Sequence, residues 1–260
     1  MANSKPTVVF IPGFWHTPEG FTPLARILEK EGYPSVLISL PSAGAHPGHP
    51  DFSQDVATIR KIITDLSNEG KEVMVVMHSG GSVSGSEASR GLGKKERQAE
   101  GKNGGIVRVI YIGILLPEAG KTLFETFQGV VSSPDLDPDF VIDEDQSFHV
   151  IAEVIRCKIL GQQVDLAFGR VSRMARCGGP LTDVPFRVGM SPLTYAAWKY
   201  IPSAYIMPLQ DKSIPLKQVR QIVKEANIKM VFEIETGHCP YLAQPETVAD
   251  FIRKAGGETI

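Results

Sequence analysis

The stretch Val73-Met74-Val75-Val76-Met77-His78-Ser79-Gly80-Gly81 decides the fold of this chain. Its first five residues are all apolar, which is typical of a strand buried on both faces of a parallel sheet. The small residues after Ser79 favour a tight turn into a helix. A serine on such a strand–turn–helix is how one large class of enzymes presents a nucleophile. The rest of the chain must then provide an acid, a histidine and donors to an oxyanion.

Strand-like and helix-like segments alternate on both sides of this stretch. Strands are predicted over 8–11, 35–40, 73–77, 107–112, 204–208 and 230–235, and helices over 19–31, 52–66, 215–226 and 240–254. This alternation indicates βαβ units and a parallel sheet with helices on both of its faces.

The alternation is lost between residues 115 and 190, which hold prolines, an acidic cluster and a helix-like stretch over 149–160. We therefore predict an α/β core built from residues 1–114 and 191–260, with a cap subdomain inserted over 115–190. The polar stretch 91–105, which is punctuated by glycines, is interpreted as a solvated surface loop.

Composition and charge limit which molecules this protein is expected to bind and where in the cell it is expected to act. The 260 residues include 27 basic and 29 acidic side chains, so no excess charge favours nucleic acid or an anionic membrane surface. Three cysteines form no disulfide framework and favour a reducing compartment. The apolar run 8–11 is too short for a signal sequence or a membrane span. We expect a cytoplasmic protein that acts on a small-molecule substrate, with a homodimer as one possible assembly.

Ser79 lies in a sequence that departs at one position from the nucleophile pattern G-x-S-x-G. Gly81 occupies the second glycine position, but Met77 replaces the first. The departure implies local space for the Met77 side chain, and it leaves two interpretations open. Ser79 is either a nucleophile or a serine at an ordinary turn between a strand and a helix.

Asp211 and His238 each follow a predicted strand, in the order Ser, acid, His that triads on this kind of sheet use. Open parallel sheets place their functional loops at the carboxyl ends of the strands. Taken alone, Asp211 fits a capping or turn residue and His238 a surface residue. Together they favour a triad in which Ser79 attacks an acyl carbon, His238 transfers the proton and Asp211 orients His238.

The backbone N–H groups of Phe14 and Gly80 are the candidate oxyanion donors, because one follows the first strand and the other follows the nucleophile. A cysteine next to the base along the chain rarely has the geometry for attack, so Cys239 is interpreted as lining the pocket. The candidate substrate-binding residues are Gly13, Trp15, His78 and Cys239.

No pattern for a metal or a bound cofactor is present in the sequence. The acidic run 135–139 lacks the glycine and the glutamate of a calcium loop, since Phe140 and Gln146 stand at those positions. The glycines at 91–93 lack both the third glycine and the preceding strand of a dinucleotide fingerprint. We therefore expect neither a metal nor a cofactor.

These motifs make the chain resemble the α/β-hydrolase fold superfamily over nearly its whole length. The resemblance rests on 12–16, 78–81, Asp211 with Ile214-Pro215, and 237–245. It is closest to the compact branch that includes plant methylesterases, hydroxynitrile lyases and uncharacterised fungal hydrolases. It implies six parallel strands and a cap. Cys239 stands where the hydroxynitrile lyases have a lysine, which argues against cyanohydrin cleavage.

The expected function is that of a cofactor-independent serine hydrolase that cleaves a small carboxylic ester, thioester or lactone through an acyl-enzyme. Two alternatives remain open from the sequence. One is a lyase of the retro-aldol type, in which Ser79 and His238 transfer protons without acylation. The other is a small-molecule receptor built on the same fold.

Overall fold

The computed structural model describes residues 5–127, 140–142, 147–150 and 184–260, and its main feature is a six-stranded parallel sheet. The strand order is β2-β1-β3-β4-β8-β9, and every neighbouring pair is parallel. The strands are β1 (Thr7–Ile11), β2 (Ser35–Leu37), β3 (Glu72–His78), β4 (Gly105–Ile112), β8 (Ser203–Pro208) and β9 (Met230–Ile234). The expected six-stranded sheet is confirmed.

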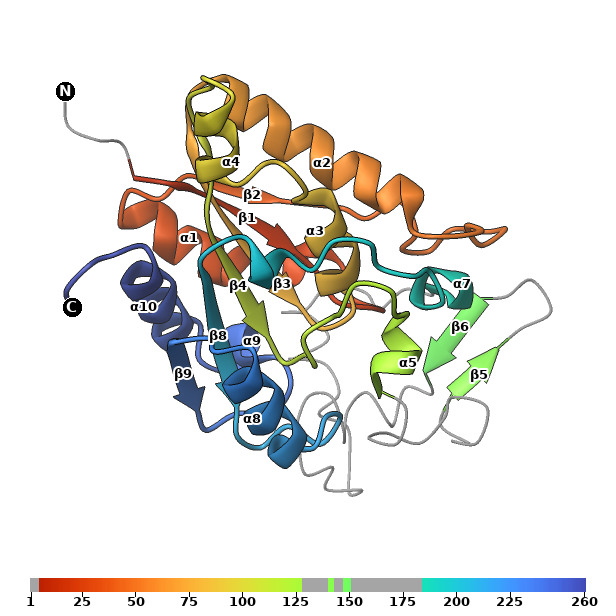
Figure 1. Cartoon of the computed structure of the whole chain (residues 1–260). Helices are drawn as coiled ribbons and strands as arrows, with labels where there is room; N and C mark the ends of the chain where they lie inside the picture. Colours follow the sequence, from red (N-terminus) through yellow and green to blue (C-terminus); the bar gives the residue numbers. More distant parts are fainter. Residues whose placement is uncertain (1–4, 128–139, 143–146, 151–183) are drawn as a thin grey trace.

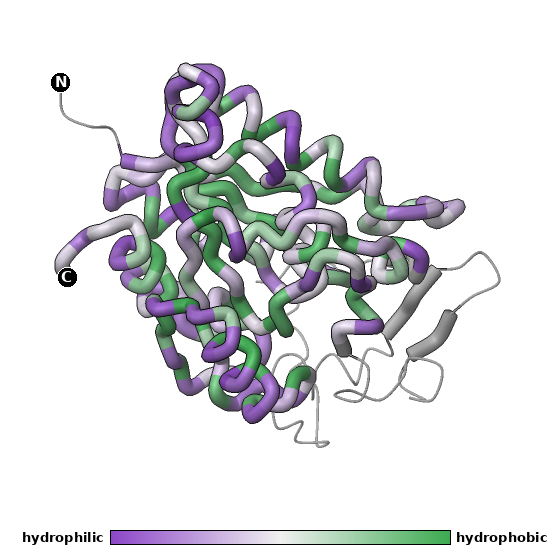
Figure 2. Tube along the Cα trace, in the orientation of Figure 1, coloured by the Kyte–Doolittle hydropathy of each residue, from purple (hydrophilic) through white to green (hydrophobic). Residues whose placement is uncertain are grey.

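Helices cover both faces of this sheet (Figure 1). On one face lie α1 (Thr22–Lys30) and α10 (Pro245–Ala255), and on the other lie α2 (Ser53–Asn68), α3 (Gly81–Ala88) and α8 (Leu216–Glu225). Figure 2 shows the strands as the apolar centre between these helices. Within the described ranges, no helix combines the length and the apolar character needed to cross a membrane.

Strand β3 explains why the sheet has two apolar faces. Val75 and Met77 belong to the hydrophobic cluster under α2 and α3, whereas Met74 and Val76 belong to the cluster under α1 and α10. Successive side chains of a strand point to opposite faces, so an unbroken apolar run fills both clusters. Because all six strands run parallel, their carboxyl ends lie at one edge of the sheet.

The stretch 91–105 is not simply the solvated loop that its charges predict. It contains the short helix α4 (Lys94–Ala99), and Arg97 in this helix is only 4% exposed. Its guanidinium donates hydrogen bonds to the Asn68 side chain at 3.0 Å and to the Asn103 carbonyl at 3.2 Å. A charged residue is buried here because backbone and amide oxygens replace its water.

The single helix predicted over 240–254 is divided into α9 (Pro240–Ala243) and α10. Gln244 lies between them with φ −139° and ψ 64°, outside the helical region. A residue that precedes a proline is disfavoured in helical conformation, and Pro245 itself has no N–H to continue the hydrogen-bond ladder. The helix predicted over 19–31 likewise begins as the short 3-10 helix η1 (Pro18–Phe21) before α1.

The segment assigned to a cap is described only in part. It contains a second, antiparallel sheet of β5 (Phe140–Ile142), β6 (Ser147–Val150) and β7 (Val184–Pro185), with the helices α5 (Leu123–Phe127) and α7 (Phe186–Gly189). His149 and Val150 lie in β6 rather than at the start of a helix, because they pair with β5. The rest of the helix predicted over 149–160, and the acidic run 135–139, lie outside the described residues. The limits of the cap stay a prediction.

Candidate active site

Ser79 occupies the turn between β3 and α3, as the sequence predicts. Its φ of +46° lies in the left-handed region, where a residue other than glycine is strained. The Ser79 N–H donates a hydrogen bond of 3.0 Å to the carbonyl of Ile112 at the end of β4. Ser79 is half-buried, while His78 before it is fully buried. The turn therefore leaves Ser79 more exposed than the buried strand residues before it.

The departure at Met77 is accommodated by a glycine eight residues later. Met77 is fully buried, and a Cβ atom on Gly85 would lie 2.6 Å from its Sδ atom. A Cβ atom on Gly81 would lie 2.0 Å from the carbonyl oxygen of Pro12. Helix α3 therefore packs so closely against β1 and β3 that only glycine fits at both positions. The spacing of Gly81 and Gly85, one helical turn apart, is the sequence signal for this close approach.

Asp211 and His238 form a hydrogen-bonded pair beyond the ends of β8 and β9. Asp211 Oδ2 lies 2.7 Å from His238 Nδ1, and each side chain is 5% exposed. Asp211 Oδ1 accepts the N–H groups of Ser213 at 2.8 Å and Ile214 at 3.3 Å, so its own turn orients the carboxylate. An ionised carboxylate only accepts, so the proton lies on Nδ1 and leaves a lone pair on Nε2.

Ser79 and His238 adjoin the same end of β4. The Ser79 N–H binds the carbonyl of Ile112, and a Cβ atom on the next residue, Gly113, would lie 3.2 Å from His238 Nδ1. The ring of His78, the neighbour of Ser79, lies 4.7 Å from the His238 ring between centroids. The three residues selected from the sequence thus gather at one edge of the sheet.

The loop after β1 reaches the same edge. A Cβ atom on Gly80 would lie 2.6 Å from the Phe14 ring, and one on Gly13 would lie 2.9 Å from the Cβ atom of Ser79. Trp15 is half-buried beside Phe14, with ring centroids 5.9 Å apart. Gly80 precedes α3, and the first N–H groups of a helix have no partner within it. The two amides named as oxyanion donors therefore lie on loops in contact.

The structure places His78 and Cys239 inside the protein beside the candidate site, and their assignment to substrate binding stays a prediction. Their exposed fractions are 0% and 4%, and both belong to a buried histidine cluster of His16, His78, Cys239 and Tyr241. His16 and Tyr241 were missed as site residues, although both lie within the stretches 12–16 and 237–245 that carry the family resemblance.

Burial determines the protonation of this cluster. It lowers the pKa of His16 to about 4, and together with the nearby His238 it holds the pKa of His78 well below its ordinary value. Burial also raises the pKa of Cys239 to about 12 and that of Tyr241 well above its ordinary value. All four side chains are therefore uncharged at neutral pH, and Cys239 is a thiol rather than a reactive thiolate.

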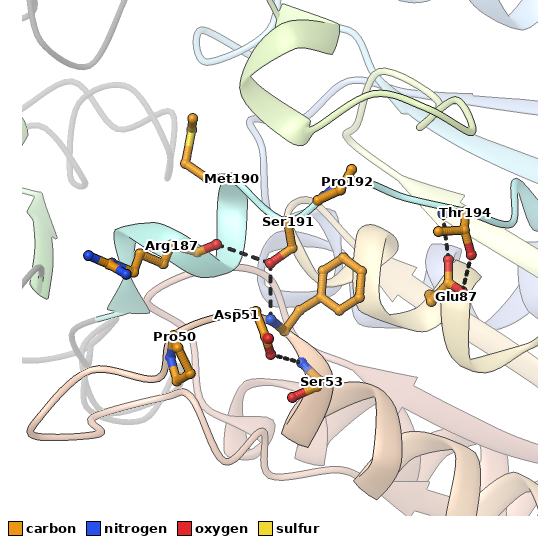
Figure 3. Close-up of a pocket in the computed structure, with 10 residues that line it drawn as sticks. Pro50, Asp51, Ser53, Glu87, Arg187, Met190, Ser191, Pro192 and Thr194 are labelled. Atoms are coloured by element: carbon orange, nitrogen blue, oxygen red, sulfur yellow. Dashed lines mark hydrogen bonds between the residues drawn. The ribbon is translucent and has the colours of Figure 1, made fainter.

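A cavity of about 460 Å³ lies apart from these residues (Figure 3). It opens between the start of α2 and the segment that follows α7, where Ser191 Oγ accepts the Phe52 N–H at 3.1 Å. Its lining contains none of Ser79, Asp211 and His238. The lining residues are Pro50, Asp51, Phe52, Ser53, Glu87, Arg187, Met190, Ser191, Pro192 and Thr194.

Comparison of the sequence with known proteins points to one family. Residues 8–251 match the model of the alpha/beta hydrolase family. The alpha/beta hydrolase nvfD of Aspergillus novofumigatus is 30% identical over 262 residues, which cover 98% of both chains. The probable hydrolase R7 of a Phoma species is 25% identical over 263 residues, which cover 98% of this chain and 99% of that protein.

Solved structures share the fold at low sequence identity. Polyneuridine aldehyde esterase has a TM-score of 0.73 at 18% identity, covering 96% of this chain and 99% of its own. The pyrethroid hydrolase PytH has a TM-score of 0.71 at 19% identity, covering 97% of each chain. The methylesterase MES16 from Arabidopsis has a TM-score of 0.69 at 18% identity, covering 97% and 99%. The expected fold is confirmed, and the chain belongs to the alpha/beta hydrolase family.

Proposed function

We propose that this protein is a serine hydrolase that cleaves a small carboxylic ester, thioester or lactone through an acyl-enzyme. The observation that carries the proposal is the buried Asp211–His238 hydrogen bond of 2.7 Å at the edge that also holds Ser79. A carboxylate that fixes one imidazole nitrogen leaves the other as a base, which is the arrangement that activates a serine. No cofactor is needed for this chemistry.

In the proposed mechanism, Ser79 Oγ attacks the acyl carbon and its proton passes to His238 Nε2. The tetrahedral intermediate then collapses, and His238 returns the proton to the leaving alcohol or thiol. A water molecule, deprotonated in turn by His238, attacks the acyl-enzyme and releases the acid. Asp211 stabilises the imidazolium form of His238 in both halves of the reaction.

The amides of Phe14 and Gly80 stabilise the oxyanion in this proposal. The contact between the Phe14 ring and Gly80 keeps their two loops together, and preorganised amides pay no reorganisation cost when the negative charge develops. One such donor is typically worth roughly 3 kcal/mol of transition-state stabilisation.

The names of the relatives support an ester substrate. The structural neighbours include an esterase of polyneuridine aldehyde, a plant methylesterase and hydrolases of pyrethroids, and the two fungal relatives are named as hydrolases. Ester hydrolysis is therefore a chemistry attributed to several proteins of this fold.

Covalent labelling tests the nucleophile. A fluorophosphonate is expected to label the wild-type protein at Ser79 with loss of fluoride, and Ser79→Ala is expected to abolish both labelling and hydrolysis of p-nitrophenyl acetate. Ser82→Ala is the matched control, because Ser82 lies one turn further along, is fully buried, and its hydroxyl has no hydrogen-bond partner among the described residues. Mass spectrometry of the labelled peptide identifies the site.

The same experiment separates the alternatives. Labelling that persists in Ser79→Ala would overturn the assignment of the nucleophile. Turnover that depends on Ser79 and His238 without a trapped acyl-enzyme would favour the lyase. Tight binding of a small molecule that Ser79→Ala leaves unchanged, with no turnover of any ester, would favour the receptor.

A further inference from the structure

We propose that the buried histidine cluster positions the His238 loop against the oxyanion loop, with His78 as the positioning residue for His238. The cluster comprises His16, His78, Cys239 and Tyr241, which are all buried beside the candidate site. This inference rests on the proposed function, in which His238 is the base and Phe14 supplies an oxyanion donor.

His78 links Tyr241 to the backbone of His238. Its Nε2 atom lies 3.1 Å from the His238 carbonyl oxygen, and its Nδ1 atom lies 3.3 Å from the Tyr241 hydroxyl. A carbonyl can only accept, so Nε2 carries the proton of the uncharged ring and Nδ1 accepts from Tyr241. The His238 carbonyl thus fixes the tautomer of His78, and the Tyr241 hydroxyl, which must then donate to Nδ1, stabilises the same tautomer.

His16 makes the corresponding contact on the oxyanion side. Its Nδ1 atom lies 2.7 Å from the carbonyl oxygen of Phe14, so Nδ1 carries the proton, and Nε2 lies 3.5 Å from the Cys239 Sγ atom. The same sulfur lies 3.9 Å from His78 Nε2. Cys239 therefore joins the two histidines, and one hydrogen-bonded cluster connects the carbonyls of Phe14 and His238.

The hydrogen bonds of this cluster run to two particular loops, whereas apolar side chains would only fill the same space. Burying polar side chains costs free energy unless each finds a partner, and an apolar core of the same volume would avoid that cost. Here each imidazole donates to a backbone carbonyl of a loop that bears a proposed reacting or stabilising group. Misplacing a reacting group by about 1 Å can cost 10²-fold in rate, so contacts that set the position of these two loops matter for turnover.

Removal of one hydroxyl tests the inference. Tyr241→Phe keeps the ring but removes the donor to His78 Nδ1, and we expect kcat for p-nitrophenyl acetate to fall about tenfold with KM unchanged. Tyr111→Phe is the matched control, because it removes a fully buried hydroxyl that lies 3.1 Å from Ser86 on the opposite face of the sheet. That control is expected to keep wild-type kcat.

Nitrogen-15 NMR of the full-length, histidine-labelled protein gives a readout that is independent of turnover. In wild type we expect His78 in the Nε2–H tautomer with Nδ1 accepting a hydrogen bond, and in Tyr241→Phe we expect the nitrogen-15 shift of Nδ1 to change because that hydrogen bond is lost. The downfield signal of the His238 Nδ1 proton, which its hydrogen bond to Asp211 produces, is expected to broaden in Tyr241→Phe and to stay sharp in Tyr111→Phe.

Several results would overturn the inference. These are a wild-type His78 protonated on Nδ1, a Tyr241→Phe protein with unchanged kcat and His238 signal, or an equal loss of kcat in Tyr111→Phe. If Tyr241→Phe does not fold, His78→Gln, which keeps an N–H near the position of Nε2, must retain more kcat than His78→Leu. Failure of the proposed function would show separately, as Ser79→Ala with full activity, while the NMR signals still report the hydrogen bonds.

Discussion

Two histidines at the same edge of the sheet, His238 and His78, have ring centroids only 4.7 Å apart but opposite surroundings. The loop after β9 places His238 against the carboxylate of Asp211, whereas the end of β3 places His78 between a tyrosine hydroxyl and a carbonyl. A neighbouring carboxylate stabilises an imidazolium, and uncharged neighbours in a buried site exclude it. In the proposed mechanism, this difference in partners suits His238 to proton transfer and His78 to support.

Removing each imidazole in turn is the strongest test of the difference between His238 and His78. We expect His238→Ala to lower kcat/KM for a small activated ester by about 10⁴-fold or more, because the base is lost. We expect His78→Leu to lower it by roughly 10- to 100-fold, because only the position of the base changes. Steady-state kinetics on folded protein, checked by circular dichroism, measures both. Equal losses would contradict the division of roles.

Asp211→Asn weakens the partner of His238 while keeping its shape. An amide does not stabilise an imidazolium and favours the wrong tautomer of His238, so kcat is expected to fall about 10³- to 10⁴-fold. KM is expected to stay within a few-fold of wild type. The measurement is kcat across pH 5 to 9, with the matched change Asp65→Asn on the exposed face of α2 as the control. Activity close to wild type would show that His238 does not need the carboxylate.

The smallest expected effect concerns stability in acid. The ordinary pKa of histidine is 6.5, and the folded-state pKa values of His16 and His78 lie below it. As pH falls from 6.5 towards 4, the unfolded chain binds protons that the folded chain does not, so stability decreases in this window and is fully present above it. Each histidine contributes a slope of roughly 1.4 kcal/mol per pH unit.

Urea unfolding at pH 7, 6 and 5 measures that slope. His16→Gln is expected to reduce the dependence on pH by one proton, whatever its effect on absolute stability. The groups that face His16 are the Cys239 thiol, His78 and His238, so no carboxylate contact described for the cluster offsets the trend. An unchanged slope in His16→Gln would mean that His16 is protonated in the folded protein.

Much of the fold and of the candidate site was predictable because each depends on local pattern. The apolar run of β3 fills both faces of a parallel sheet, and Ser79, Asp211 and His238 each lie beyond the carboxyl end of a predicted strand. The helix α4 was not predicted, because the charges around Arg97 indicated a solvated loop. The break at Gln244 was not predicted, because the helical periodicity continues across Pro245.

The sequence by itself determined which residues end a strand and which turn needs small side chains. It also determined which three side chains come together at the carboxyl edge of the sheet. Only the tertiary structure decided the contacts of His78 and Cys239, which are both buried in the cluster with His16 and Tyr241. The physical reason is that periodicity reports burial within strands and helices, whereas a loop side chain depends on partners far away along the chain. Cys239 meets His16, 223 positions away, and that contact has no counterpart in any local pattern.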